Sequence, residues 1–170
     1  MDSAVLVKLI ESVHGEGVSL EYVAGMPYWE MMPGARHHDA LMSIWSRLTN
    51  ERKGSGDCGC YPYAELTLGF PDGSVKTPDL SIFCERPTER EGLVHLIPEA
   101  VVEIVSPGYE RKDLEIGPTF YLGQGVKDIL VFDPRSNLIT HFRRDGVKSS
   151  IAPAVFELEC GCTVPISQVD

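Results

Sequence analysis

The spacing of hydrophobic residues predicts a helix, a β-hairpin and a second helix in the first third of the chain. Apolar side chains recur at helical spacing over residues 3–13, and a glycine-containing break follows. Residues 19–23 and 26–32 form two short strand-like runs around an Ala-Gly turn. From 36 to 49 the apolar side chains fall on one helical face, with two histidines in the first turn.

The rest of the chain reads mainly as strands. Residues 61–68 alternate in polarity, a Pro-Asp-Gly turn follows, and TPDLSIFC forms the next strand. The run Ala-Val-Val-Glu-Ile-Val at 100–105 has the composition of a central strand that is covered on both faces. A buried strand at 128–132 is expected to pair with a hairpin arm at 137–143.

The remaining segments complete a single domain over residues 1–170. Residues 113–122 predict a helix that Gly117-Pro118 weakens, and the tail TVPISQVD is expected to be loose or paired at an edge. The order of elements indicates an α+β (α/β) fold with a mixed β-sheet core, flanking helices and an N-terminal helix and hairpin.

Two acidic residues interrupt the apolar strands. Asp79 stands at the entrance of one strand and Glu103 in the middle of another. A buried carboxylate has to be neutralised by a proton, a basic side chain or a metal ion. Asp79 could instead cap a turn, whereas a purely structural role explains Glu103 less well. Two such residues on neighbouring strands predict a divalent cation site.

Composition is ordinary for a globular domain, with 43% hydrophobic and 24% charged residues. We expect a cytoplasmic protein without a membrane segment, because the N-terminus has no leader pattern and no apolar run approaches spanning length. Two Cys-Gly-Cys triplets at 58–60 and 160–162 could supply zinc ligands. Their one-residue spacing is unusual for zinc, so free thiols are favoured over zinc or a disulfide, with Cys84 as buried packing.

The charge balance opposes DNA binding without excluding it. Fifteen basic residues face 25 acidic ones, giving a net charge of −10, whereas DNA binding uses a positive footprint. Two small basic patches are available, at 52–53 and at 143–144. A bound Mg²⁺ would cancel part of a carboxylate cluster.

Several motifs together resemble the Uma-two-type endonucleases, a branch of the PD-(D/E)XK nuclease superfamily. The run VVEIVSPGYERKDLEIGPTFYLGQGVKDILVFDP follows TPDLSIF and the N-terminal SLEYVAGMPYWEMMPGARHH. The resemblance covers most of the chain. It implies a restriction-endonuclease-like fold and a metal-dependent endonuclease that hydrolyses DNA phosphodiester bonds.

The resemblance also implies site residues. Asp79, Glu103 and the carbonyl of Ile104 would bind Mg²⁺ or Mn²⁺, with Glu21 extending the acidic cluster. Glu21 could equally face solvent from its strand. His38 could orient water, contact phosphate or cap its helix. Nucleases that cut both DNA strands often pair, and the N-terminal hairpin offers an edge for a homodimer, but the sequence leaves the oligomeric state open.

One part of the family pattern is missing. The superfamily usually has a lysine two residues after the Glu, where this chain has Val105, and the substitute lysine of Uma-two-type sequences is replaced by Gly117. Lys112 and Arg111 are the nearest replacements, although Lys112 could also belong to an exposed turn. Loss of a cation at transition-state charge lowers rates by orders of magnitude. The alternative is therefore a catalytically inactive nuclease fold that acts as a binding or regulatory module.

Overall fold

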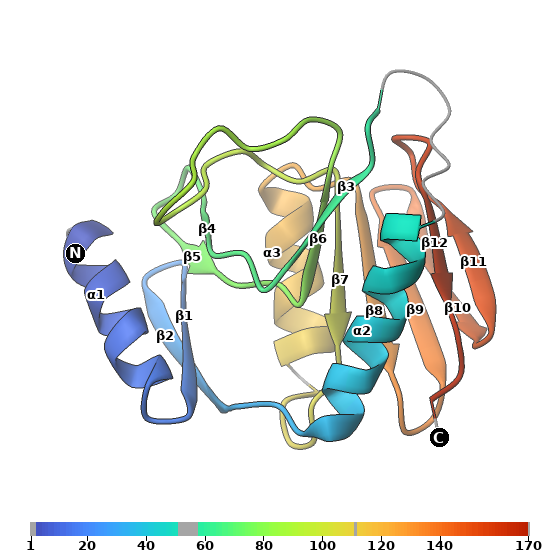
Figure 1. The fold of residues 1–170 in the computed structure, drawn as a ribbon, viewed down its shortest axis with the longest axis horizontal. Coiled ribbons are helices and arrows are strands. Elements are labelled where there is room, and N and C mark those ends of the chain that lie inside the picture. The colour runs from blue at the N-terminus through green and yellow to red at the C-terminus, as the bar shows by residue number, and fades with distance from the viewer. Residues whose placement is uncertain (1–2, 51–57, 111, 170) are drawn as a thin grey trace.

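A computed structural model describes residues 3–50, 58–110 and 112–169, and its centre is a six-stranded mixed sheet (Figure 1). The strand order is β10 (Gly146–Ile151), β9 (Leu138–Arg143), β8 (Asp128–Asp133), β7 (Ala100–Ile104), β6 (Leu80–Phe83) and β3 (Tyr61–Ala64). Strands β7 and β8 run parallel, and the other four pairs are antiparallel. The mixed sheet with its helices confirms the predicted fold class.

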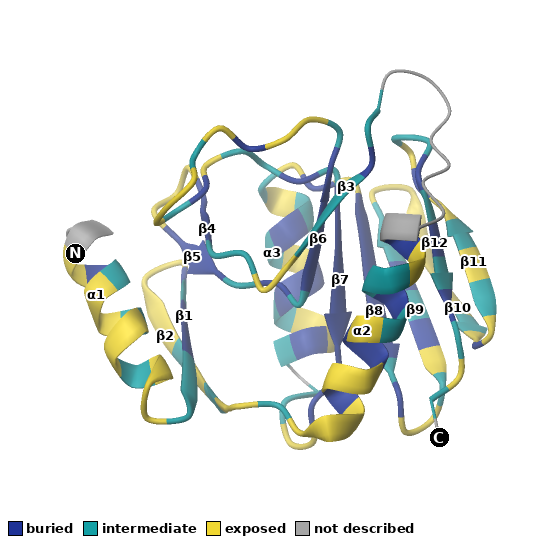
Figure 2. Cartoon of the chain, viewed as in Figure 1, coloured by how far each residue is buried: buried dark blue, intermediate teal, exposed yellow. Residues whose placement is uncertain are grey.

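Apolar layers cover both faces of this sheet. Helix α2 (Ala35–Asn50) and the hairpin of β11 (Ala154–Glu157) and β12 (Thr163–Ile166) cover one face, and α3 (Gly117–Gly123) covers the other. Side chains of a strand alternate between faces, so Val102 and Ile104 join the α2 layer while Val101 joins the α3 layer. The inner strands are buried along their length (Figure 2).

A smaller antiparallel sheet lies beside the central one. Its order is β2 (Met26–Met31), β1 (Val18–Val23), β5 (Val75–Lys76) and β4 (Leu68–Gly69), and helix α1 (Ser3–His14) packs against β1. The chain leaves this sheet at β5 and enters β6 of the central sheet after a connection of three residues. That short connection carries Asp79.

The Gly-Pro pair marks the beginning of a helix. A π-helical turn over Lys112–Ile116 continues directly into α3, which begins at Gly117. Pro118 lies in the first turn of α3, where the backbone N–H that proline lacks has no partner within the helix. Gly117-Pro118, which was expected to weaken a single helix, therefore lies where the π-helical turn ends and α3 begins.

The C-terminal tail is paired and not loose, which is one of the two forms expected for it. The tail forms β12, which pairs with β11 and buries Val164 and Ile166 in the core. Strands β10 and β11 were not predicted; none of their residues is buried, and their apolar side chains Val147, Ile151 and Val155 are exposed. Within the described residues, no helix has both the length and the hydropathy required to cross a membrane.

The cysteines also differ from their prediction. Cys58 is bonded to Cys84 and Cys60 to Cys162, while Cys160 keeps a free thiol. Free thiols were therefore the wrong expectation for four of the five cysteines. The pairing depends on tertiary contacts between segments 26 and 102 residues apart in sequence.

Candidate active site

Asp79 links three elements. Its Oδ2 atom accepts a 2.6 Å hydrogen bond from the backbone N–H of Ile104, at the end of the neighbouring strand β7. Its Oδ1 atom lies 2.9 Å from Nε2 of His37 on α2. Both carboxylate oxygens therefore engage groups from other elements, which a local turn cap does not do.

Glu103 is buried in the middle of β7, on the face covered by α3. Its Oε1 atom accepts a 2.6 Å hydrogen bond from the Tyr121 hydroxyl, and Oε2 accepts one of 3.3 Å from the backbone N–H of Asp79. Burial is the main reason that the pKa of Glu103 rises to about 8; Lys76 offsets it only in part, and Asp79 adds to it. In the absence of a cation, Glu103 is mostly protonated at neutral pH.

Glu21 forms a buried ion pair with Lys76. The side chains come from β1 and β5, and Lys76 Nζ lies 2.7 Å from Oε2 of Glu21. The backbone N–H of Thr77 donates to Oε1 at 3.1 Å. Burial disfavours a charge on Glu21, but Lys76 and Lys112 hold its pKa below the ordinary value. Glu21 is thus an ionised partner for two lysines.

Lys112 is held among three carboxylates at the start of the π-helical turn. Its Nζ lies 2.9 Å from Glu30, 3.5 Å from Asp113 and 3.7 Å from Glu21. Burial disfavours the ammonium form, yet the carboxylates, led by Glu21, raise the pKa of Lys112. The side chain is 14% exposed and carries a lasting positive charge. It belongs to the site and is not part of an exposed turn.

His37, rather than its neighbour His38, reaches Asp79. His37 is buried in the first turn of α2, with Nδ1 3.3 Å from the Ser106 hydroxyl, whereas His38 is exposed. Burial alone would lower the pKa of His37. The hydrogen bond and the charge of Asp79 act in the opposite direction and outweigh burial, so the pKa lies above its ordinary value. His37 continues the helical spacing of Leu41 towards the core, and that pattern could have identified it.

These side chains meet at a small cavity. Asp79, Glu103, Ile104 and Lys112, all predicted from the sequence, line it together. The cavity adjoins a larger one of about 400 Å³, which shares His37 and Asp79 with it and extends to α1. The larger cavity thus reaches Asp79, whereas Glu103 lines only the small one.

The donor atoms suit a hard divalent cation. Mg²⁺ prefers carboxylate and carbonyl oxygens, and it commonly keeps only one or two protein carboxylates together with several waters. Among the described residues, no three acidic or histidine side chains of this site have ligand atoms within 4.8 Å of one another. The carboxylates of Asp79 and Glu103 and the backbone of Ile104, which line the small cavity, offer oxygen ligands of this kind. The oxygens of Glu21 already accept hydrogen bonds from Lys76 and Thr77.

Two residues of the site were not identified from the sequence. Lys76 and Tyr121 are both fully enclosed, and Lys76 Nζ lies 5.1 Å from the centre of the Tyr121 ring. A lysine in the apolar strand before Asp79 was the available sign for Lys76. Arg111, named as a possible replacement cation, lies outside the described residues, as does the basic pair at 52–53.

Comparison with known proteins gives the family and the fold of this chain. The family Uma2, described as "Putative restriction endonuclease", matches residues 7–160. A crystal structure described as a "putative nuclease belonging to DUF820" from Anabaena variabilis ATCC 29413 has a TM-score of 0.62 and 24% sequence identity. The alignment covers 81% of this chain and 80% of that one, which establishes a common fold. No curated protein matches the sequence.

Proposed function

Because the chain belongs to the Uma2 family of restriction-endonuclease-like proteins, we propose that it is a divalent-metal-dependent endonuclease that hydrolyses DNA phosphodiester bonds at the cavity around Asp79 and Glu103. One observation carries the proposal. The carboxylates of Asp79 and Glu103 line a single cavity together with the ammonium group of Lys112. This combination supplies acidic metal ligands and a fixed cation at one place.

Asp79, Glu103 and the carbonyl of Ile104 are the proposed metal ligands. When bound, Mg²⁺ or Mn²⁺ would activate water and stabilise negative charge on the phosphate. Glu21 would have an indirect role, because it lines neither cavity of the site and its carboxylate forms a buried ion pair with Lys76. It would hold the lysines close to Glu103 without binding the ion itself.

Lys112 takes the proposed role of the missing lysine. Its ammonium group is held by Glu30 and Asp113 and lines the same cavity as Glu103. Preorganised positive charge near a phosphate stabilises the charge that develops in the transition state. His37 would orient Asp79 through the bond between Nε2 and Oδ1, with Ser106 fixing the other side of its ring.

The second candidate is an inactive nuclease fold that binds a partner. It is favoured by the position two residues after Glu103, where Val105 is buried in the apolar layer, and by Gly117, which has no side chain. Under this alternative the acidic pair would remain as a binding site while phosphate hydrolysis is lost.

Metal titration and plasmid nicking separate the two candidates. Calorimetry with Mn²⁺ is run on wild type, Asp79→Ala and the control Asp145→Ala, whose side chain is exposed on a turn. Nicking of supercoiled DNA is measured for wild type, Glu103→Gln and the control Glu91→Gln, also exposed. The endonuclease proposal expects Mn²⁺ binding and nicking that only the site variants lose. Binding without nicking supports the second candidate, and absence of both contradicts the metal site.

A further inference from the structure

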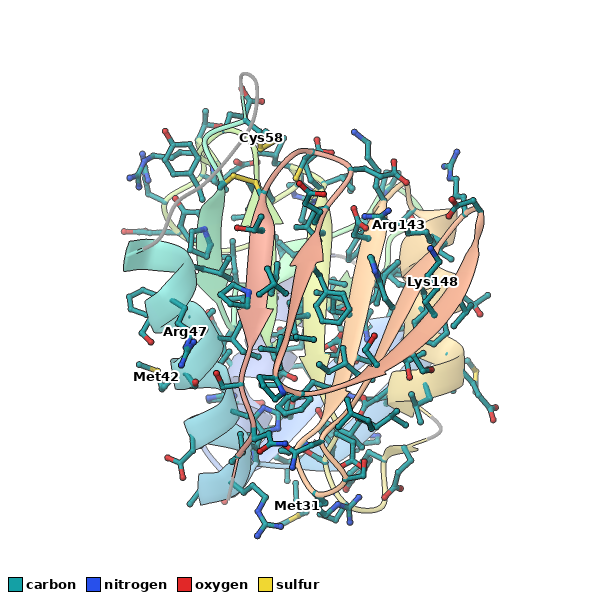
Figure 3. The ribbon with its side chains drawn as sticks, turned by 90° about the vertical axis from the view of Figure 1, so that its right-hand side faces the viewer. Met31, Met42, Arg47, Cys58, Arg143 and Lys148 are labelled. Atoms are coloured by element: carbon teal, nitrogen blue, oxygen red, sulfur yellow. A yellow bond between two sulfur atoms is a disulfide. The ribbon has the colours of Figure 1, made fainter. Side chains whose placement is uncertain are left out.

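All five cysteines gather at one end of the molecule, away from the candidate active site. They come from three segments: Cys58 and Cys60 lie directly before β3, Cys84 follows β6, and Cys160 and Cys162 lie in the turn between β11 and β12. Figure 3 shows disulfide sulfur atoms beside the labelled Cys58. The cluster connects the β3–β6 edge of the central sheet to the C-terminal hairpin.

The sulfur atoms are closer together than two separate disulfides require. The Sγ atoms of Cys58, Cys84 and Cys160 all lie within 4.8 Å of one another, as do those of Cys58, Cys60 and Cys162. Cys58 belongs to both groups and lies 3.4 Å from Cys162, to which it is not bonded. The fifth cysteine, Cys160, lies beside them with a free thiol and takes part in neither disulfide.

This arrangement has the chemistry of a tetrathiolate metal site. Zn²⁺ is bound tetrahedrally by cysteine thiolates at about 2.3 Å, which places neighbouring sulfur atoms about 3.8 Å apart. The sulfur atoms of Cys58, Cys84 and Cys160 already form one group, and Cys162, which is close to Cys58, has to move towards the other two once both disulfides are reduced. The backbone N–H of Cys162 also hydrogen-bonds to the Cys160 sulfur, and the Lys127 ammonium interacts electrostatically with Cys160. Burial raises the pKa of the Cys160 thiol, and the bond from Cys162 offsets this only in part, so a bound cation would be needed to hold the thiolate.

We propose that the reduced cluster binds one Zn²⁺ through Cys58, Cys84, Cys160 and Cys162. The first three form one close group of half-buried thiols, open to metal entry, and Cys162 is the thiol that adjoins Cys58. Cys60 and Cys162 are both buried in the core, and Cys162 is the proposed fourth ligand because its sulfur atom lies 3.4 Å from that of Cys58. The zinc ion would fasten the C-terminal hairpin to the edge of the central sheet.

The disulfide-bonded form is then the oxidised, metal-free state of the same site. Two molecules of a dithiol reductant transfer four electrons and four protons to the two disulfides, and each dithiol becomes a disulfide. Binding of Zn²⁺ by the four ligand cysteines then releases four thiol protons. An oxidant of the disulfide class reverses both steps and releases the ion.

Cys160→Ser is the most informative variant, because Cys160 takes part in neither disulfide. Protein is reduced with a dithiol, incubated with Zn²⁺, desalted without oxygen and assayed for zinc by elemental analysis. Wild type is expected to hold about one zinc ion per chain, and Cys160→Ser less than about a tenth of that. Cys60→Ser is the matched control and should keep its zinc.

Further samples test whether a loss of zinc comes from misfolding, and whether the zinc is bound at the candidate active site instead. Circular dichroism has to show that Cys160→Ser is folded, and Asp79→Ala should retain the cluster zinc. Wild type oxidised to two disulfides should bind none. The proposal is overturned if reduced wild type holds no stoichiometric zinc, or if Cys160→Ser binds zinc as well as wild type does.

Discussion

Glu103 illustrates how position alters the chemistry of a single residue. A glutamate in water is ionised at neutral pH, but burial raises the pKa of Glu103 to about 8, with Tyr121 donating a hydrogen bond to its Oε1 atom. Its neighbour Asp113 has a pKa raised to about 6, also mainly by burial. A cation that binds here must displace protons.

Mn²⁺ affinity is therefore expected to increase with pH. Below the pKa of Glu103 a proton has to leave before the ion binds, so affinity should fall by up to about tenfold for each unit below 8. Calorimetry in buffers with different ionisation enthalpies should detect proton release at pH 7. Affinity that is constant from neutral to alkaline pH would contradict the site, and Glu103→Gln should not bind.

Lys112 provides a second test at the residue scale. Lys112→Met removes the cation while keeping an unbranched side chain, and we expect nicking to fall by about 100-fold or more because transition-state charge loses its partner. Mn²⁺ binding should persist, since Glu30 and Asp113 are then no longer neutralised by Lys112. Lys148→Met is the exposed control, on β10. Equal nicking by Lys112→Met and wild type would remove Lys112 from the mechanism.

At the scale of elements, the junction between the π-helical turn and α3 determines whether a lysine introduced at Gly117 has room for its side chain. A Cβ atom at Gly117 would lie 3.2 Å from the Lys112 carbonyl oxygen and 3.9 Å from the Tyr121 ring. The position therefore faces the layer that contains Glu103, and a side chain fits only tightly.

Gly117→Lys is expected to raise nicking by about tenfold over Gly117→Ala, because a cation regains access to the phosphate. The alanine variant controls for the close contact with the Lys112 carbonyl. Initial rates of plasmid nicking at equal Mn²⁺ give the comparison. If the two variants nick equally, the absence of lysine at this position is not what limits the rate.

Asp128 connects three elements on the far side of the sheet. Its carboxylate lies 2.7 Å from Nε2 of His141, accepts a hydrogen bond from Arg143, and accepts another of 2.8 Å from the Glu159 backbone N–H. Arg143 is thus a structural residue rather than part of an open basic patch. Burial disfavours ionisation of Asp128, but the bonds to His141, Glu159 and Arg143 keep its pKa below the ordinary value.

Asp128→Asn is expected to lower the free energy of unfolding by about 3 kcal/mol or more, because Arg143 and His141 lose their buried partner. The contribution of Asp128 is present above its unfolded-state pKa and is lost as pH falls through its lower folded-state pKa. Urea unfolding at neutral and acidic pH measures both effects. Asp145→Asn, on an exposed turn, should be close to neutral.

For the whole molecule, the main tension is between a net charge of −10 and a DNA substrate. The cavity of about 400 Å³ includes the acidic residues Glu11, Glu30 and Glu65. On the other side of His37, a cavity of about 370 Å³ is lined by Arg36 and Arg135. Arg135 is already paired with Glu110 and Asp133, so DNA is expected to approach from the side of Arg36.

Arg36→Ala should weaken DNA binding several-fold and reduce the salt dependence by about one phosphate contact, while Mn²⁺ binding is unchanged. Fluorescence anisotropy with Ca²⁺ in place of Mn²⁺, at several salt concentrations, measures both effects. Arg144→Ala, at the exposed β9–β10 turn, is the control. A larger loss from Arg144→Ala than from Arg36→Ala would place the DNA elsewhere.

The sequence by itself determined most of the helices and central strands and the acidic pair. Periodicity located α1, α2 and the first hairpin, and a charge inside an apolar strand pointed to Glu103, since burial of a lone carboxylate is costly. The family resemblance then pointed to Lys112. These signals are local, because each depends on a few neighbouring residues.

Only the tertiary structure decided which distant groups meet. It brought His37 instead of His38 to Asp79, placed the buried Lys76 beside Glu21, and gathered five cysteines at one end. It also fixed the C-terminal tail in the core as β12. Such contacts join residues far apart in the chain, and their distances depend on how sheets and helices pack, which spacing along a sequence does not specify.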